Sequence, residues 1–438
     1  MREKLLEATP KYVTPLENSK LPFEEFDYEK NQDLKRELTE TWRNLKPEVQ
    51  RDQYNKKIGN FYREKGYFDP TKEQNNFRLM WEEAEKRLQF DSGIKLLEIN
   101  DHLQERAACD YLEMIENIDQ IKSLYRFKKK SVGSTGLDAN EAQIIKSCLR
   151  QGRELFESGR NSPMMVKPLI FFYSFTAYVY ALIVMNNPLR YRLSMLNGSH
   201  GVNFVDSKSR IQFGGDITEG TFSDLFTSFS VINHVGNGVE LLQDNRESIM
   251  AFWKSRYEIS ILELLSMIPE LRDYYKLLTG ENSRTHQLKV VRGQNHRAIS
   301  WDIFIGDGHD LPSREDLESS FKDCEISRSE GKAKVSISNE KMQGIRGTIY
   351  SDIYGDFWYV ENPLHPVVLP EICVHFLLMS SFSNIMRYNP YEWSRILENE
   401  TDSKISLLIR RYISIFEHKL PILLMRGLTE FHAMLAKR

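Results

Sequence analysis

The chain has 438 residues, which is enough for two or three domains and a large hydrophobic core. Hydrophobic residues make up 41% and charged residues 28%, a balance that excludes wholesale disorder. Because 59 basic residues are offset by 62 acidic ones, the formal net charge is only -3. The chain therefore has no global positive field for nucleic acid, and any such binding needs a local basic patch.

The first 135 residues have the pattern of a charged helical region. After an arm of about 30 residues, apolar residues recur at helical spacing over residues 31–61, 71–90 and 96–127. A basic cluster at residues 126–130 then leads into a linker rich in Gly and Ser. This cluster could contact phosphate, but a solvated helix end is the simpler interpretation. Residues 1–135 are thus predicted to form an N-terminal helical extension.

The longest apolar stretch runs from residue 168 to residue 187 and follows a charged helix predicted over residues 138–158. The short turn at residues 159–163 between them predicts a helical hairpin. The apolar stretch is long enough to span a membrane. However, it carries hydroxyl groups through its middle, which neighbouring helices can satisfy and lipid cannot. We therefore predict a buried central helix and no membrane contact.

Beyond the hairpin, short strands are predicted within residues 202–213, and helices over residues 218–231 and 249–278. Between residues 285 and 360, β-branched and aromatic residues alternate between Gly, Asn and Asp turns, which predicts about five strands. Helices follow at residues 367–388, 403–416 and 420–435. The predicted fold is mainly α, a helical bundle with a small β-rich insertion. Its parts are a core over 136–284, the insertion over 285–362 and C-terminal helices over 363–438 that complete the core.

Neither a metal nor a cofactor is expected. The four cysteines, at positions 109, 148, 324 and 373, have no CxxC or Cys-His spacing, which disfavours a disulfide framework or a zinc site. His286, His296 and His309 lie among aspartates but lack a regular ligand spacing, so surface residues are the better interpretation. The first residues lack the apolar region of a signal peptide. A cytoplasmic protein is expected.

A set of short motifs, in their order along the chain, resembles the YaaC-like family of bacterial proteins. The resemblance covers about residue 140 to the end and implies a family fold, although the function of that family is largely unassigned. The residues that carry it are Arg153–Phe156, Lys167–Leu169, Phe172–Tyr173, His200–Gly201, Glu371 with the apolar run through Phe382, Asn384–Pro390, Trp393 and Leu420–Pro421.

The central hairpin also resembles a HEPN core, the helical fold of many bacterial toxins and phage-defence nucleases. In that group, a charged helix and a small turn precede a Tyr-rich helix and a His-Gly-type loop. The resemblance implies metal-independent RNA cleavage by an Arg-x4-6-His motif, in which Arg holds the phosphate and His moves the proton of a 2′-hydroxyl. Such chemistry needs a cation and a titratable imidazole on one surface.

Two Arg-His pairs approach this motif. Arg192 and His200 have seven residues between them, one more than the motif allows, and His200 could instead simply anchor its loop. Arg411 and His418 have six residues between them, and seven positions are about two helical turns, so both side chains would share a helix face. We predict His200 as the acid/base and Arg192 as the phosphate clamp, with Arg411 and His418 as a second candidate pair.

Three further residues are candidate ligand-binding groups. Lys167 could reach a phosphate, although a lysine that snorkels at a helix start is the better explanation. Tyr173 could stack on a base or pack in the core, and Arg387 could bind a ligand or pack on aromatic neighbours. The predicted function is RNA or nucleotide biology, including phage defence, with RNA or a nucleotide as partner. The alternative is a non-catalytic helical protein that binds a nucleotide, a partner subunit or a second copy of itself.

Overall fold

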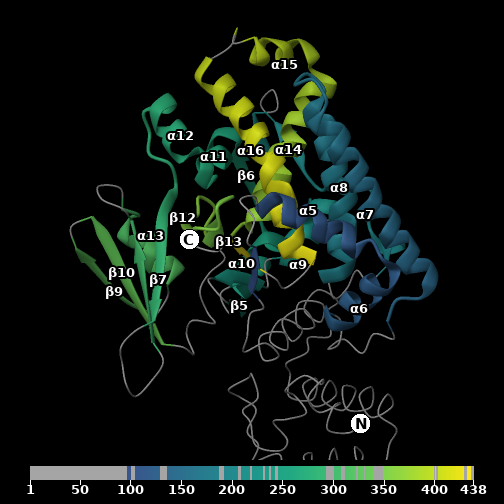
Figure 1. Ribbon diagram of the computed structural model, residues 1–438. Coiled ribbons are helices and arrows are strands. Elements are labelled where there is room, and N and C mark those ends of the chain that lie inside the picture. The colour runs from purple at the N-terminus through teal and green to yellow at the C-terminus, as the bar shows by residue number, and fades with distance from the viewer. Residues whose placement is uncertain are drawn as a thin grey trace, which may run out of the picture.

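The computed structural model describes residues 96–99, 104–128, 136–186, 192–205, 209–217, 220–229, 232–235, 238–241, 245–292, 300–306, 311–321, 324–329, 331–338, 349–398, 400, 403–428 and 432–435 (Figure 1). The helices predicted over residues 31–61 and 71–90 lie outside the described residues. Within the described part the fold is mainly α, as the sequence predicts.

The predicted helical hairpin is formed by α7 (Ala139–Arg160) and α8 (Lys167–Asn186), which run side by side in Figure 1. Asp138 caps α7 by accepting a hydrogen bond of 2.8 Å from the Glu141 backbone N–H. The helices approach closely because α7 has no side chain at Gly152, where a Cβ would lie 2.6 Å from the Tyr178 ring. The Ser174 hydroxyl uses this closeness to donate to the Gly152 carbonyl at 2.6 Å.

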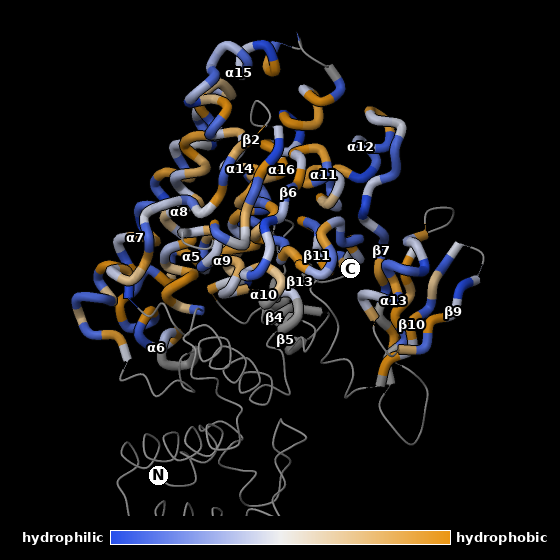
Figure 2. Tube along the Cα trace, turned by 180° about the vertical axis from the view of Figure 1, so that it is seen from behind, coloured by the Kyte–Doolittle hydropathy of each residue, from blue (hydrophilic) through white to orange (hydrophobic). Residues whose placement is uncertain are grey.

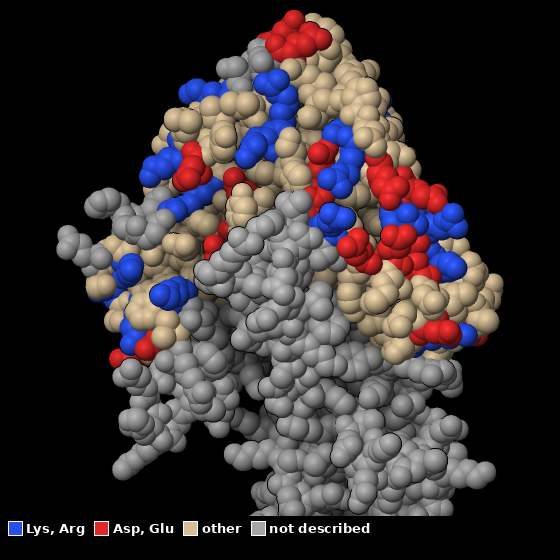
Figure 3. All heavy atoms as spheres, in the orientation of Figure 1, with Lys and Arg blue, Asp and Glu red and all other residues tan. Residues whose placement is uncertain are grey.

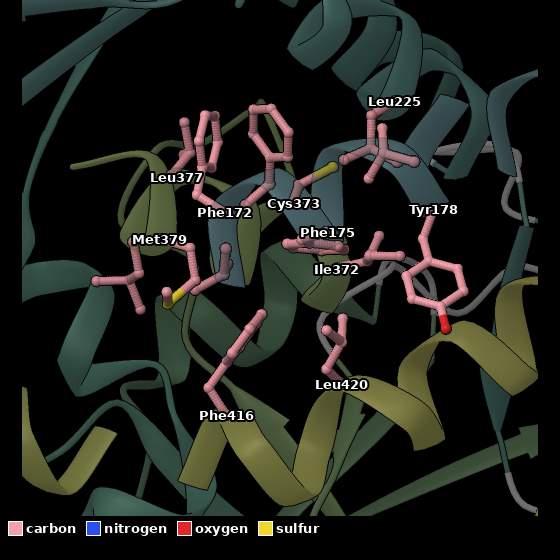
Figure 4. Close-up of a cluster of buried hydrophobic side chains, with 14 of the residues drawn as sticks. Phe172, Phe175, Tyr178, Leu225, Ile372, Cys373, Leu377, Met379, Phe416 and Leu420 are labelled. Carbon is pink, nitrogen blue, oxygen red and sulfur yellow. The ribbon is translucent and has the colours of Figure 1, made fainter. Parts of the chain in front are cut away.

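Helix α8 lies at the centre of the main hydrophobic core, between α14 (Glu371–Tyr388) and α16 (Ser403–Leu428). The Phe175 ring contacts the Phe376 ring of α14, with 5.9 Å between the centroids. It also contacts the Phe416 ring of α16 at 5.6 Å, and Figure 4 shows Phe175 and Phe416 in the core. Among the described residues, α8 is the one helix long and apolar enough to cross a membrane. Most of it is buried inside the fold, as in the core helix of a globular protein.

Shorter elements surround this core, and Figure 2 shows their apolar residues in orange among the packed elements. The helices are α5 (Gln104–Ile115), α6 (Ile118–Lys128), α9 (Thr221–Phe229), α10 (Asn245–Lys254), α11 (Ile261–Ser266), α12 (Arg272–Thr279) and α15 (Pro390–Leu397), with 3-10 turns η3 (Leu193–Met195) and η5 (Pro269–Leu271). The strands are β1 (Leu96–Ile99) parallel to β13 (His432–Leu435), β4 (Ile232–Val235) paired with β5 (Gly238–Leu241), and the three-stranded sheet β2 (Asn203–Val205), β3 (Arg210–Gly214) and β6 (Arg256–Ser260).

Four predicted helices differ from the structure. The helix predicted over 96–127 begins with a strand, β1, and is divided into α5 and α6. The helix predicted over 249–278 is interrupted by β6, because Tyr257 and Ile259 pair there with Phe213 and Ile211 of β3. The predicted helices 403–416 and 420–435 form one continuous helix, α16, which ends at Leu428 and is followed by β13. Pro421 lies inside α16, where buried apolar residues on both sides offset its cost of about 3 kcal/mol.

The β-rich region forms a six-stranded antiparallel sheet with the strand order β11-β12-β7-β8-β10-β9. Helix α13 (Arg314–Ser320) covers one face of this sheet. Its Leu317 and the following Phe321 form a hydrophobic cluster with Ile303 and Val335 of the strands. The sequence predicts five of these strands but not β9 or α13. The strands are β7 (Thr285–Arg292), β8 (Ser300–Ile305), β9 (Glu325–Ser329), β10 (Lys332–Ser338), β11 (Ile349–Ser351) and β12 (Phe357–Val360).

Candidate functional site

The loop that carries His200 joins η3 to β2 and is fixed by backbone hydrogen bonds. Asn197 begins the turn by accepting a hydrogen bond of 3.1 Å from the Ser199 N–H. The carbonyls of Ser199 and His200 then accept from the backbone N–H groups of Thr221 and Phe222, at 2.9 and 3.0 Å. These two donors belong to the first turn of α9, whose N–H groups have no partner within the helix. The loop therefore sits on the N-terminus of α9.

Two glycines allow this contact. Gly201, directly after His200, has a φ of +70°, which L side chains rarely adopt. Gly220 has a φ of +141°, and a Cβ there would lie 2.5 Å from the Gly201 nitrogen. The glycine of the His-Gly pair is thus required by the backbone, independently of any chemistry of the imidazole.

The imidazole of His200 is half-buried against the hairpin. Its ring meets the Phe172 ring of α8 edge-on, with 5.1 Å between the centroids. Its Nδ1 is buried and has no hydrogen-bond partner among the described groups. Burial, together with the positive charge of Arg387, lowers the pKa of His200 below its ordinary value of 6.5. The imidazole is therefore neutral at neutral pH, the form that can accept a proton.

Arg387 reaches this place from the last turn of α14, far from His200 in the sequence. Its guanidinium lies over the ring of Tyr388, 5.0 Å from the centroid, and its Nε is buried without a partner. One turn earlier on the same face of α14, the fully buried hydroxyl of Ser383 also has no partner. Buried polar atoms are normally hydrogen-bonded. The His200 imidazole and the Arg387 guanidinium, each with an unsatisfied buried atom, thus belong to the junction of the His200 loop, α8 and α14.

Tyr173 follows Phe172 on α8 and is 45% exposed, although the rest of the helix is largely buried. The centroids of the two rings lie 6.1 Å apart. The predicted ligand residue is therefore accessible and neighbours Phe172, the residue that the imidazole contacts.

Lys167, in contrast, is occupied by groups of the protein itself. Its ammonium is buried, forms an ion pair with Glu417 of α16 and donates a hydrogen bond of 3.1 Å to the carbonyl of Arg160. These contacts hold the turn between α7 and α8 against α16, a structural explanation for this lysine.

Arg411 and His418, the second predicted pair, are both exposed on α16, and each contacts a different neighbour. The guanidinium of Arg411 lies 5.2 Å from the ring centroid of Tyr274 on α12. His418 Nδ1 lies 2.5 Å from Glu105 Oε2 on α5, and Arg160 binds the other oxygen of Glu105 at 2.8 Å. The two side chains thus share the exposed face of α16 but engage different elements, α12 and α5.

Arg192 is exposed directly before η3, on the segment that leads into the His200 loop. The guanidinium whose charge acts on the His200 imidazole belongs to Arg387. In the sequence, Arg387 belongs to the motif Asn384–Pro390, and no local pattern predicts that it lies near His200. Only the antiparallel packing of α14 on α8 brings them together.

A second charged cluster is fully enclosed. Lys419 of α16 lies 2.9 Å from Glu270 Oε1 and 2.7 Å from Glu371 Oε1, and Arg426 lies 3.2 Å from Glu371 Oε2. Burial opposes the charge of Lys419, but the two carboxylates outweigh it and raise the pKa of this ammonium. Its two cations and two anions balance each other. This cluster is therefore a structural ion network rather than a place where a substrate can bind.

Other charged side chains give no comparable site. In Figure 3, acidic and basic side chains intermingle on the face that it displays. Among the described residues, no group of three or more His, Cys, Asp or Glu could hold a metal ion. The junction of His200 and Arg387 is thus the candidate functional site.

Comparison with known proteins gives one match. A family model described as YaaC-like Protein matches residues 110–428, a range that includes α6 to α16 and contains both His200 and Arg387. No curated protein matches the chain. No solved structure matches it either.

Proposed function

Because the chain belongs to the YaaC-like family, whose description specifies no reaction, we propose a function from the site itself: metal-independent cleavage of RNA. The observation that carries the proposal is the half-buried imidazole of His200 on the Phe172 ring, within the electrostatic reach of the Arg387 guanidinium. The α7–α8 hairpin followed by a His-Gly loop supports a HEPN-like core as its scaffold. The proposed setting is the bacterial cytoplasm, in phage defence or RNA turnover.

In the proposed reaction, His200 takes the proton of a ribose 2′-hydroxyl. Its Nδ1 faces the interior, which leaves Nε2 to meet the substrate. The 2′-oxygen attacks the adjacent phosphorus, the bond from phosphorus to the 5′-oxygen breaks, and the proton passes to that leaving oxygen. The products carry a 2′,3′-cyclic phosphate and a 5′-hydroxyl. Arg387 stabilises the negative charge that develops on the phosphate oxygens.

A non-catalytic binding protein is the second candidate. Arg387 comes from α14, so the pair departs from the Arg-x4-6-His pattern, in which the arginine shortly precedes the histidine. The same imidazole and guanidinium would bind the phosphate of a nucleotide without cleaving it.

The test is cleavage of end-labelled single-stranded RNA by the purified full-length chain in EDTA, with identification of the product ends. We expect His200→Ala to lower the rate by about 100-fold or more, the usual contribution of an acid/base group. Arg387→Ala should lower it by about 100- to 1000-fold, since it removes transition-state charge stabilisation. Arg387→Lys keeps a charge and should retain part of the activity.

Two matched variants define the controls. His418→Ala should leave the rate unchanged, because the His418 imidazole is paired with Glu105 of α5 and not with the groups around His200. Arg192→Ala tests which arginine binds the phosphate. If Arg192→Ala lowers the cleavage rate and Arg387→Ala does not, Arg192 is the phosphate clamp. Wild-type protein that binds RNA but leaves it intact would favour the non-catalytic candidate.

A further inference from the structure

We infer that the substrate of this site is single-stranded RNA whose bases stack on an exposed tyrosine row formed by Tyr173, Tyr388 and Tyr391. The inference rests on the proposed function, in which the phosphate lies at His200 and Arg387. It adds the substrate class and the residues that would select it.

The three tyrosines are exposed although their rings are large and mainly apolar. Tyr173 is 45% exposed, Tyr388 66% and Tyr391 72%. Two of them are sequence neighbours of residues at the candidate site. Tyr173 follows Phe172, whose ring contacts His200, and Tyr388 follows Arg387 and lies under its guanidinium. Aromatic surface thus borders both the predicted acid/base and the predicted clamp.

The third tyrosine is held in place by the start of α15. Asn389 caps this helix by accepting a hydrogen bond of 3.3 Å from the Glu392 N–H. The buried Trp393 packs on Phe382 and donates from Nε1 to the Met165 carbonyl, just before α8, at 3.0 Å. Tyr391 therefore stands on a fixed turn beside the N-terminal end of α8. A fixed ring loses little conformational entropy when a base stacks on it.

Charge distinguishes this surface from an ordinary apolar patch. The guanidinium of Arg387 lies over Tyr388, and that of Arg395 lies over Tyr391, 5.9 Å from its centroid. Arg395 is also paired with Glu392 at 3.1 Å, which helps to orient it. Rings that alternate with guanidinium groups suit a strand of stacked bases and phosphates. A duplex keeps its base faces covered, so this surface favours single strands.

The experiment measures binding of a fluorescent 2′-O-methyl oligoribonucleotide to the full-length chain by anisotropy. This probe has no free 2′-hydroxyl and is not cleaved, so binding is read separately from catalysis. We expect the single strand to bind at least tenfold more tightly than the same sequence in a duplex. Tyr388→Ala and Tyr391→Ala should each weaken single-strand binding by about tenfold, the usual effect of losing one stacking ring. Tyr391→Phe should bind like the wild type.

The matched control is Tyr354→Ala, because Tyr354 is also 66% exposed but lies in the turn between β11 and β12. It should leave binding unchanged. Equal affinity for duplex and single strand, or tyrosine variants with wild-type affinity, would overturn the inference. A change in oligomeric state without a change in RNA affinity would assign the row to a protein interface instead. Loss of cleavage in His200→Ala with intact binding of the probe separates this inference from the proposed function.

Discussion

The acid-base properties of His200 come from neighbours contributed by separate segments of the chain. Phe172 of α8 covers its ring, Arg387 of α14 supplies a positive charge, and the start of α9 holds its backbone. The sequence shows only a histidine before a glycine. The lowered pKa follows from burial first and from the charge of Arg387 second.

The first prediction concerns this pKa. A titration of the His200 ring by NMR should give a pKa below the ordinary 6.5, and Arg387→Ala should raise it because the repelling cation is removed. Since only the neutral imidazole accepts a proton, the acid limb of the cleavage rate should shift to higher pH by the same amount. Arg387→Lys should keep the low pKa. A pKa that stays unchanged in Arg387→Ala would contradict the electrostatic contact between the two residues.

At the scale of elements, the α7–α8 hairpin depends on small residues at the helix contact. Cβ atoms at Gly152 and Gly159 would each lie 2.6 Å from an aromatic carbon, of Tyr178 and Phe171 respectively. The sequence predicts the hairpin correctly because apolar spacing and the turn are local signals. These same glycines fix how closely the two helices pack, and hence where Phe172 and Tyr173 stand.

The second prediction is that Gly152→Ala lowers the free energy of unfolding by about 1–3 kcal/mol, because the methyl group overpacks the contact with Tyr178. Alanine would by itself favour the helix by about 1 kcal/mol, so the steric effect must exceed this gain. The measurement is urea unfolding followed by circular dichroism. Gly198→Ala is the control, since nothing lies within 4 Å of the added Cβ. Equal midpoints for Gly152→Ala and the wild type would show that the hairpin can open to accept the methyl group.

At the scale of the whole molecule, the enclosed ion network joins the helical core to the β-sheet. Lys419 connects Glu270 of η5 and Glu371 of α14, and it also donates to the carbonyl of Ser351 in β11. Arg426 completes the network by bonding to Glu371 and to the Ser351 hydroxyl. The edge strand of the sheet is thus anchored to α16 by buried charges.

The third prediction is that Lys419→Met destabilises the protein by about 3–5 kcal/mol, since it leaves the buried Glu270 without its cation and Glu371 with Arg426 alone. The double variant Lys419→Met/Glu270→Gln should recover part of this loss, because it removes the orphaned charge. Calorimetry or chemical unfolding measures both. Arg150→Ala, which breaks an exposed pair with Glu154, should cost less than about 0.5 kcal/mol. If Lys419→Met lowers the free energy of unfolding no more than Arg150→Ala does, the network has no structural role.

The sequence by itself determined the elements whose signals are local. The hairpin, the α9 segment and five strands of the six-stranded sheet follow from apolar spacing, alternation and turn residues. The interruption by β6 was missed because its pairing partner, β3, lies more than 40 residues away. For the candidate site, the sequence indicated His200, Tyr173 and Arg387, but it also allowed a purely structural role for each of them.

Tertiary structure decided which of these residues act together. It placed Arg387 next to His200, occupied Lys167 with Glu417, and engaged Arg411 and His418 with different neighbours. The physical reason is that spacing along a chain fixes only the face and the turn on which a side chain lies. Proximity between α8, α14 and the His200 loop depends on how buried faces pack, and burial then sets the charge that each group carries.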